Sequence, residues 1–178
     1  MNLTAIQSAL REAHLDGWLF YDHHHLDAIA YRVLGIAPKM CTRRWYYLIP
    51  AEGEPAKLVH RIERGNLEGP PGAELQYSSW KEQRESLKRI LYGKHRIAMQ
   101  YSALNDIPYI GLVDAGTIEL VKSFGVEIVS SADLVQLFEA RWSDAVLALH
   151  LEAGKVIHAA VRAGFGMIRE AVRAGKAI

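Results

Sequence analysis

Short apolar runs alternate with segments of helical periodicity, and this alternation restricts the fold more than any other feature of the chain. Residues 18–21 form a continuously apolar run, as expected for a strand that is covered on both faces. Residues 96–99 and 126–129 predict two further strands. The segment between them, residues 113–124, has helical spacing and stops at Gly125. Strands that alternate with helices predict an α/β sheet with helices on both faces.

A hairpin interrupts the alternation and makes the predicted sheet mixed. Residues 44–49 are rich in aromatic strand formers, and residues 56–60 return as a partner strand. The connection at residues 50–55 contains two prolines and a glycine, which are typical of turns. The other predicted elements are helices over residues 3–13, 26–34, 80–91 and 133–138, and a short strand over residues 75–77.

The last segment of the chain predicts one long helix. Ser143 can serve as its N-cap, with Asp144 in the first turn, where a negative charge favours the helix dipole. An apolar stripe at helical spacing then continues to Gly175, through Val146, Leu149, Ala153, Val156, Ile157, Ala160, Val161, Gly164, Ile168 and Val172. No later element follows on which this stripe could pack, so we expect additional chain to cover it in the intact protein.

Composition excludes partners that are held mainly by charge. Lysine and arginine number 21, and aspartate and glutamate number 20, so no strong field exists for nucleic-acid phosphates or for an anionic membrane. No stretch approaches the roughly 20 apolar residues of a membrane span, and the start of the chain does not have the pattern of a leader peptide. The single cysteine, Cys41, suits a reducing compartment. We therefore expect a soluble, cytoplasmic protein that binds neither nucleic acid nor membrane.

Four segments occur in a characteristic order along nearly the whole chain. They are DGWLFYDHHHLDAIAYRVLGI, TRRWYYLIPAEGEPAKLVHRIE, RIAMQY and VDAGTIELVKSFGVEIVSSADLVQLFEARWSDAVLALHLEAGKVIHAAV. This ordered set resembles the N-terminal domain of the creatinase, prolidase and aminopeptidase P family, with its junction to the pita-bread catalytic domain. The turn at residues 31–35 departs from the family pattern, because Arg32 and Val33 replace the usual residues.

The resemblance implies a ribonuclease-H-like α/β domain over residues 1–142 and, over residues 143–178, the first helix of a catalytic domain that the chain does not contain. Such N-terminal domains are non-catalytic and contribute to homodimer contacts and to the rim of the active site. Catalysis in the family uses two divalent metal ions, commonly manganese, cobalt or zinc, held by two Asp, one His and two Glu of the pita-bread domain. The chain itself shows none of that motif set, so we expect no catalytic residue, metal ligand or cofactor in it.

Two functions of different classes remain open. The leading hypothesis is an accessory domain of an Xaa-Pro metallopeptidase, whose peptide substrate is cleaved next to proline by the intact protein. The alternative is a freestanding α/β binding or regulatory module without peptidase activity. The sequence does not decide between a dipeptidase and an aminopeptidase.

His23, His24 and His25 follow the first predicted strand, where α/β sheets tend to place functional loops. Consecutive side chains diverge, and no second ligand stands at helical i, i+4 spacing, so a zinc site is disfavoured. The resemblance implies instead that these histidines form a polar loop that reaches the active-site mouth of a partner subunit.

Arg43 and Arg44 are the other candidate residues for the substrate rim. A guanidinium fork accepts two carboxylate oxygens in one plane, and a peptide substrate ends in a carboxylate. Solvated charge at the edge of a sheet is the interpretation that we favour for these two arginines.

Overall fold

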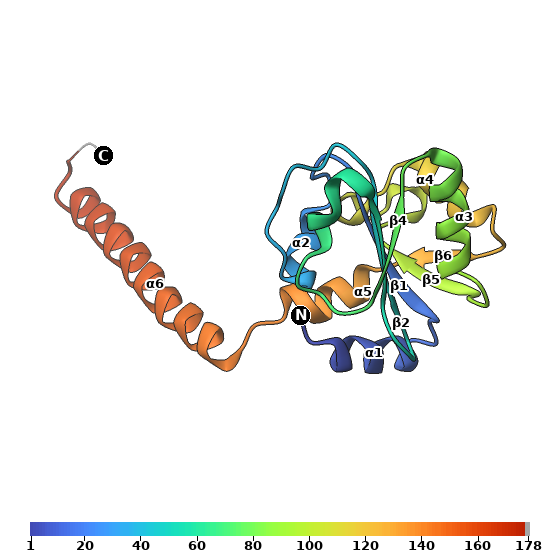
Figure 1. The fold of residues 1–178 in the computed structure, drawn as a ribbon. Coiled ribbons are helices and arrows are strands. Elements are labelled where there is room, and N and C mark those ends of the chain that lie inside the picture. The colour runs from blue at the N-terminus through green and yellow to red at the C-terminus, as the bar shows by residue number, and fades with distance from the viewer. Residues whose placement is uncertain (177–178) are drawn as a thin grey trace. The chain divides into compact units, whose positions relative to one another are not determined.

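A computed structural model describes residues 1–176, which fall into a first unit, Met1–Ala140, and a second unit that begins at Arg141. The last two residues of the predicted segment 143–178 lie outside the described residues. The first unit contains one six-stranded sheet with the order β4-β3-β2-β1-β5-β6 (Figure 1). Its strands are β1 (Gly17–Asp22), β2 (Trp45–Pro50), β3 (Ala56–His60), β4 (Ala73–Tyr77), β5 (Arg96–Met99) and β6 (Glu127–Ser130).

Strand directions show that the sheet is mixed, as predicted. Strand β1 is antiparallel to β2, with Trp18 opposite Ile49, and parallel to β5. Strands β2 and β3 are antiparallel, with Tyr46 opposite Leu58, which confirms the predicted hairpin. The pairs β3–β4 and β5–β6 are parallel, so only β2 runs against the other strands. The carboxyl ends of β1, β3 and β4 therefore lie at the same edge of the sheet as the beginning of β2.

Helices cover both faces of the sheet, which confirms the predicted α/β class (Figure 1). One face packs against α1 (Leu3–Glu12), α2 (Ala28–Leu34) and α5 (Ala132–Val135), and the other against α3 (Trp80–Ile90) and α4 (Ala115–Lys122). Successive side chains of a strand point to opposite faces. Trp18 and Phe20 therefore join the first core, whereas Leu19 and Tyr21 join the second. Burial on both faces explains why β1 is a continuous apolar run rather than an alternating one.

Local capping fixes the helices that border the edge where β1, β3 and β4 end. The Asp27 carboxylate accepts a hydrogen bond from the amide of Ala30 over 2.9 Å at the beginning of α2. Gly35 has a φ of +67° and ends that helix, as predicted. Ser79 and Glu82 form a capping box that begins α3.

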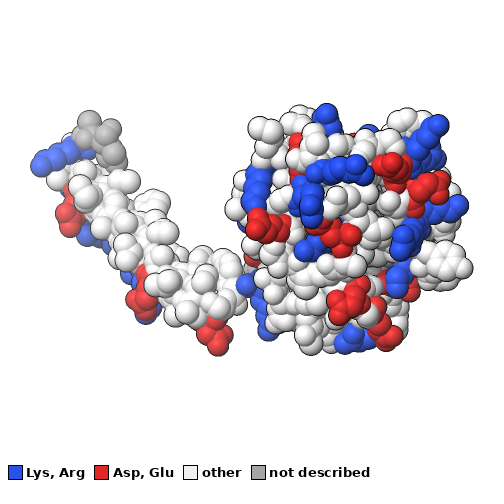
Figure 2. Space-filling model, viewed as in Figure 1, with Lys and Arg blue, Asp and Glu red and all other residues white. Residues whose placement is uncertain are grey.

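The second unit is a single helix, α6 (Asp144–Arg173), of 30 residues. The Ser143 hydroxyl accepts a hydrogen bond from the amide of Val146 over 3.3 Å, which confirms the predicted N-cap. Gly175 has a φ of +66°, just beyond the end of the helix. Figure 2 shows charged side chains along one side of α6 and uncharged ones along the other. Among residues 1–176, no helix combines the length and apolar character that a membrane crossing requires.

Candidate functional site

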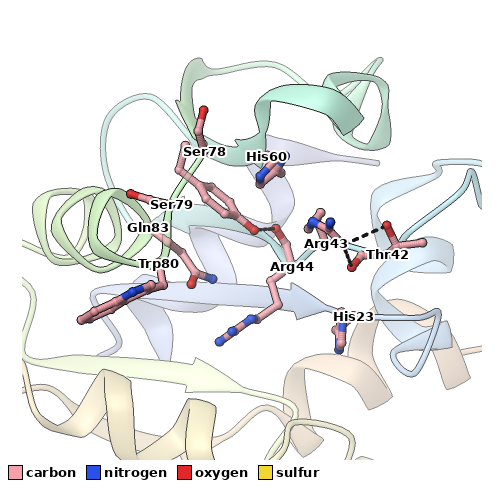
Figure 3. Close-up of a pocket in the computed structure, with 10 residues that line it drawn as sticks. His23, Thr42, Arg43, Arg44, His60, Ser78, Ser79, Trp80 and Gln83 are labelled. Atoms are coloured by element: carbon pink, nitrogen blue, oxygen red, sulfur yellow. Dashed lines mark hydrogen bonds between the residues drawn. The ribbon is translucent and has the colours of Figure 1, made fainter.

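A cavity of about 340 Å³ lies at the edge where β1, β3 and β4 end (Figure 3). Its walls come from the last residues of β3 and β4, from the segments that follow β1 and β4, from the segment before β2, and from the first turn of α3. The lining residues are His23, Thr42, Arg43, Arg44, His60, Tyr77, Ser78, Ser79, Trp80 and Gln83. Loops at the carboxyl ends of strands are where α/β sheets place ligand sites, so this cavity is the candidate site of the first unit.

Of the three predicted histidines, the structure brings only His23 into the cavity lining. His24 and His25 have φ values of +60° and +61°, a left-handed conformation that is uncommon for residues other than glycine. The amide of His24 donates to the carbonyl of Cys41 over 3.1 Å, and Nε2 of His25 lies 2.6 Å from the carbonyl oxygen of Lys39. Within residues 1–176, no group of three His, Cys, Asp or Glu side chains could hold a metal ion.

The buried Asp22 side chain holds the backbone of the histidine loop, residues 23–25, through a hydrogen bond. The side chain is fully buried at the end of β1, and Oδ2 accepts hydrogen bonds from the Tyr31 hydroxyl over 2.7 Å and from the His25 amide over 3.1 Å. Oδ1 accepts from the Asp27 amide over 3.0 Å, and the Cys41 thiol lies 3.3 Å from Oδ2. These four partners satisfy a carboxylate that would otherwise be costly to bury.

Burial governs the titration of the groups around Asp22. It raises the pKa of Asp27 to about 7, with a further contribution from the Asp22 charge. Burial and the Asp22 charge also raise the pKa of the Cys41 thiol to about 11. Because the reactive form of a cysteine is the thiolate, Cys41 is a structural thiol at neutral pH rather than a nucleophile.

Arg43 and Arg44 both line the cavity, and their predicted place on an edge of the sheet is wrong. They precede β2, which lies between β1 and β3 in the sheet. Figure 3 shows the two side chains extending away from each other, with Arg44 directed toward the side of Trp80. Among the described residues, no carboxylate lies within salt-bridge distance of either guanidinium.

The Glu63 carboxylate holds the backbone of the arginine segment. It accepts hydrogen bonds from the amides of Thr42 and Arg43 over 3.1 and 3.0 Å, and from the Thr42 hydroxyl over 2.5 Å. Burial opposes ionisation of Glu63, but the Thr42 and Arg43 hydrogen bonds prevail and lower its pKa. The Tyr77 hydroxyl donates to the carbonyl of Arg44 over 2.6 Å, which ties the same segment to the end of β4.

Aromatic and amide groups complete the walls of the cavity. The rings of His60 and Tyr77 meet edge to face, with centroids 4.9 Å apart. Gln83 is buried and donates a hydrogen bond to the Tyr46 hydroxyl over 3.0 Å. Trp80, in contrast, is 62% exposed. The cavity therefore combines positive charge with a flat apolar surface.

Comparisons with known proteins address the fold of the chain. No family model matches the chain, and no curated protein sequence matches it. Solved structures do match. The creatinase/prolidase N-terminal domain of an X-Pro dipeptidase from Streptococcus pyogenes superposes with a TM-score of 0.57 at 13% identity, covering 75% of this chain and 95% of that one. The fold is that of a creatinase/prolidase N-terminal domain.

Two prolidases share this N-terminal-domain fold. The enzyme from Pyrococcus horikoshii OT3 matches with a TM-score of 0.55 at 16% identity and covers 92% of this chain. The enzyme from Thermococcus sibiricus matches with a TM-score of 0.60 at 14% identity and covers 87% of this chain. The chain spans 42% and 40% of the lengths of these two prolidases. The resemblance seen in the sequence is confirmed at the level of the fold.

Seven of the ten residues that line this cavity were not identified from the sequence. His60, Tyr77 and Ser78 stand at the ends of two correctly predicted strands, and Trp80 begins a correctly predicted helix. The rule that ligand sites follow the carboxyl ends of strands could have selected the first three. No sequence signal identified Gln83, whose polar side chain lies on the buried face of α3.

Proposed function

We propose that this chain is the non-catalytic N-terminal domain of an Xaa-Pro metallopeptidase, the class of enzyme that hydrolyses peptide bonds next to proline. In this proposal residues 1–142 form the N-terminal domain, and residues 143–178 form the first helix of the pita-bread catalytic domain. The intact enzyme is a cytoplasmic homodimer, and the N-terminal domain contributes to dimer contacts and to the rim of the active site.

The difference in coverage between two matches is the observation that supports this division. The isolated N-terminal domain from S. pyogenes covers 75% of this chain, whereas the prolidase from P. horikoshii covers 92%. The first unit, Met1–Ala140, holds 140 of the 178 residues, so the longer match extends into α6. A likeness that continues into α6 only when the matched protein is a whole prolidase supports α6 as part of the domain that follows.

The metal ions of the proposed enzyme belong to the catalytic domain. The resemblance implies two divalent ions, manganese, cobalt or zinc, and the described residues 1–176 offer no cluster of three metal-ligating side chains. The residues present here do not fit such a centre, so no step of metal chemistry is assigned to them. Their proposed contribution is to bind and orient the peptide.

The rim role is proposed for the loops at the carboxyl edge of the sheet. His23, Arg43 and Arg44 line one cavity there, and His24 and His25 lie on the same loop as His23. Guanidinium groups without carboxylate partners are suited to the terminal carboxylate of a peptide.

Steady-state kinetics of the full-length enzyme test the rim role. Replacing His23, His24 and His25 together with alanine is expected to raise the KM for an Xaa-Pro peptide several-fold and to change the stability of the domain much less. His95→Ala is the matched control, because His95 is an exposed histidine that does not line the cavity. An unchanged KM together with a large loss of stability would show that the histidines are structural.

A further inference from the structure

Among the described residues, no carboxylate forms an ion pair with the cationic side chains of the cavity. Its lining contains Arg43, Arg44, His23 and His60 and contains no aspartate or glutamate. The five ion pairs found among the described residues do not include either arginine. A concave surface that gathers cationic side chains attracts anions, because the low-dielectric walls focus the field.

Two acidic groups, Glu63 and Asp114, lie near the two arginines of the cavity. Burial opposes the ionisation of both, but hydrogen bonds and, to a smaller extent, the charges of the arginines lower their pKa values. Glu63 accepts hydrogen bonds from the backbone amides of Thr42 and Arg43, and Asp114 accepts from the amide and hydroxyl of Thr117 over 2.9 and 2.8 Å. The Arg43 guanidinium is held by the Thr42 carbonyl over 3.1 Å through Nη1, which leaves its other nitrogens available.

The amides of Ser78, Ser79 and Glu82 at the beginning of α3 already have acceptors within the chain. Glu82 accepts from the amides of Ser78 and Ser79 over 2.7 and 3.3 Å, and the Ser79 hydroxyl accepts from the Glu82 amide. The capping box therefore satisfies these donors within the chain. Recognition of an anion in this cavity depends on the guanidinium groups instead.

An exposed aromatic wall stands beside the arginines. Trp80 is 62% exposed and lines the cavity, and Arg44 extends toward its side in Figure 3. The volume of about 340 Å³ is at the small end of the range for ligand pockets, roughly 300 to 1,000 Å³. A ligand that fits would have one anionic group and a small apolar body.

We propose that this cavity is a binding site for a small organic carboxylate of about dipeptide size, complete within the N-terminal domain itself. Arg44 binds the carboxylate, and Arg43 with the two histidines adds positive charge. Trp80 packs against the apolar body of the ligand. This site goes beyond the proposed rim role, because it requires neither a catalytic domain nor a second copy of the chain.

Titration of the 178-residue chain, followed by nuclear magnetic resonance, tests the site. The probes are the dipeptide Ala-Pro, its C-terminal amide and inorganic phosphate. Ala-Pro is expected to give saturable shifts at the indole of Trp80 and at the amides of Arg44 and Ser78, with a Kd of about 1 mM or below. The amide, which lacks the carboxylate, is expected to bind at least about tenfold more weakly, since a hydrogen bond to a charged group is lost.

Three variants locate the binding on the chain. Arg44→Gln and Trp80→Ala are each expected to weaken Ala-Pro binding at least about tenfold, because each removes one of the two proposed contacts. Arg89→Gln removes the same charge from an exposed position on α3 outside the cavity and should leave the Kd unchanged. Since Arg44 is exposed and its carbonyl bond to Tyr77 is retained, the variant is expected to fold.

Several results would contradict the proposal that this cavity is a carboxylate-binding site. They are no saturable shift with Ala-Pro, equal binding of Ala-Pro and its amide, tighter binding of phosphate than of Ala-Pro, and equal effects of Arg44→Gln and Arg89→Gln. None of these results bears on whether a longer protein cleaves Xaa-Pro bonds, so the site and the proposed function fail separately.

Discussion

The amide of Asp27 donates a hydrogen bond to Oδ1 of Asp22 over 3.0 Å and so links two buried carboxyl groups between the end of β1 and the beginning of α2. The two carboxyl groups differ in how well they are paired. Asp22 accepts from Tyr31 and His25 as well, whereas Oδ2 of Asp27 has no hydrogen-bond partner among the described residues. Burial raises the pKa of Asp27 to about 7, so its side chain binds a proton near neutral pH in the folded state.

Asp27 is expected to make stability depend on pH. Its pKa is about 7 in the folded state and about 3.9 in the unfolded chain, so the folded state binds more protons between these values. The free energy of unfolding should therefore fall as pH rises from about 4 to about 7 and level off above that. Asp27→Asn keeps the cap to Ala30 and should remove about 2 to 3 kcal/mol of the decrease between pH 5 and pH 8.

Urea unfolding at pH 5 and pH 8 measures this effect of Asp27. Asp106→Asn is the control, because Asp106 is exposed and should leave the pH dependence of the wild-type chain intact. An Asp27→Asn chain that loses as much stability as the wild type between the two pH values would contradict the assignment.

Asp22 is expected to be the most sensitive polar position of the domain. Asp22→Ala leaves the Tyr31 hydroxyl and two backbone amides without their acceptor in a buried place, which should cost about 3 to 5 kcal/mol. Asp22→Asn keeps one acceptor oxygen and should cost less. Denaturant unfolding compares the two variants, and hydrogen exchange at the His25 amide reports on the loop. Equal stability of the two variants would show that hydrogen bonding by Asp22 matters little.

The fold was largely predictable because its signals are local. The apolar run of β1, the turn residues Gly53 and Pro55 between β2 and β3, and the glycine stop at Gly35 each act within a few residues. Local patterns therefore located most of the strands and helices. The sheet order was not derivable in this way, because crossover connections decide which strands become neighbours. Arg43 and Arg44 were for that reason assigned to an edge, although β2 is an interior strand.

The cavity was only partly predictable because its residues converge from distant segments. His23 and His60 are 37 positions apart in the sequence, and both line the cavity only because β1 and β3 end at the same edge of the sheet. The left-handed backbone of His24 and His25 is held in part by a bond between distant segments, from the His24 amide to the Cys41 carbonyl. No local pattern distinguishes His23, which lines the cavity, from the two histidines that follow it.

Helix α6 is expected to drive self-association of the 178-residue chain. Residues 141–176 form no second helix or strand, so the unit itself cannot cover its apolar stripe. Burial of each large apolar side chain would contribute about 1.5 to 3 kcal/mol, and another copy of the chain is the available partner. Sedimentation should show a dimer for the whole chain and a monomer for a version ending at Trp142.

A pair of variants separates the stripe of α6 from its charged side. Leu149→Glu places a charge on the stripe and should abolish the dimer, whereas Arg162→Glu changes charge outside the predicted stripe and should preserve it. A whole chain that stays monomeric at high concentration would contradict the expectation.

Peptidase activity of the longer protein tests the assignment as an N-terminal domain most directly. The measurement is hydrolysis of Ala-Pro and of a longer Xaa-Pro peptide, with added manganese, by the product of the complete reading frame and by the 178-residue chain alone. We predict metal-dependent cleavage by a longer product that carries two Asp, one His and two Glu as metal ligands, and no cleavage by the chain alone. A reading frame that encodes no such domain, or turnover by the purified 178-residue chain itself, would contradict the assignment, and the former would favour a freestanding α/β binding or regulatory module.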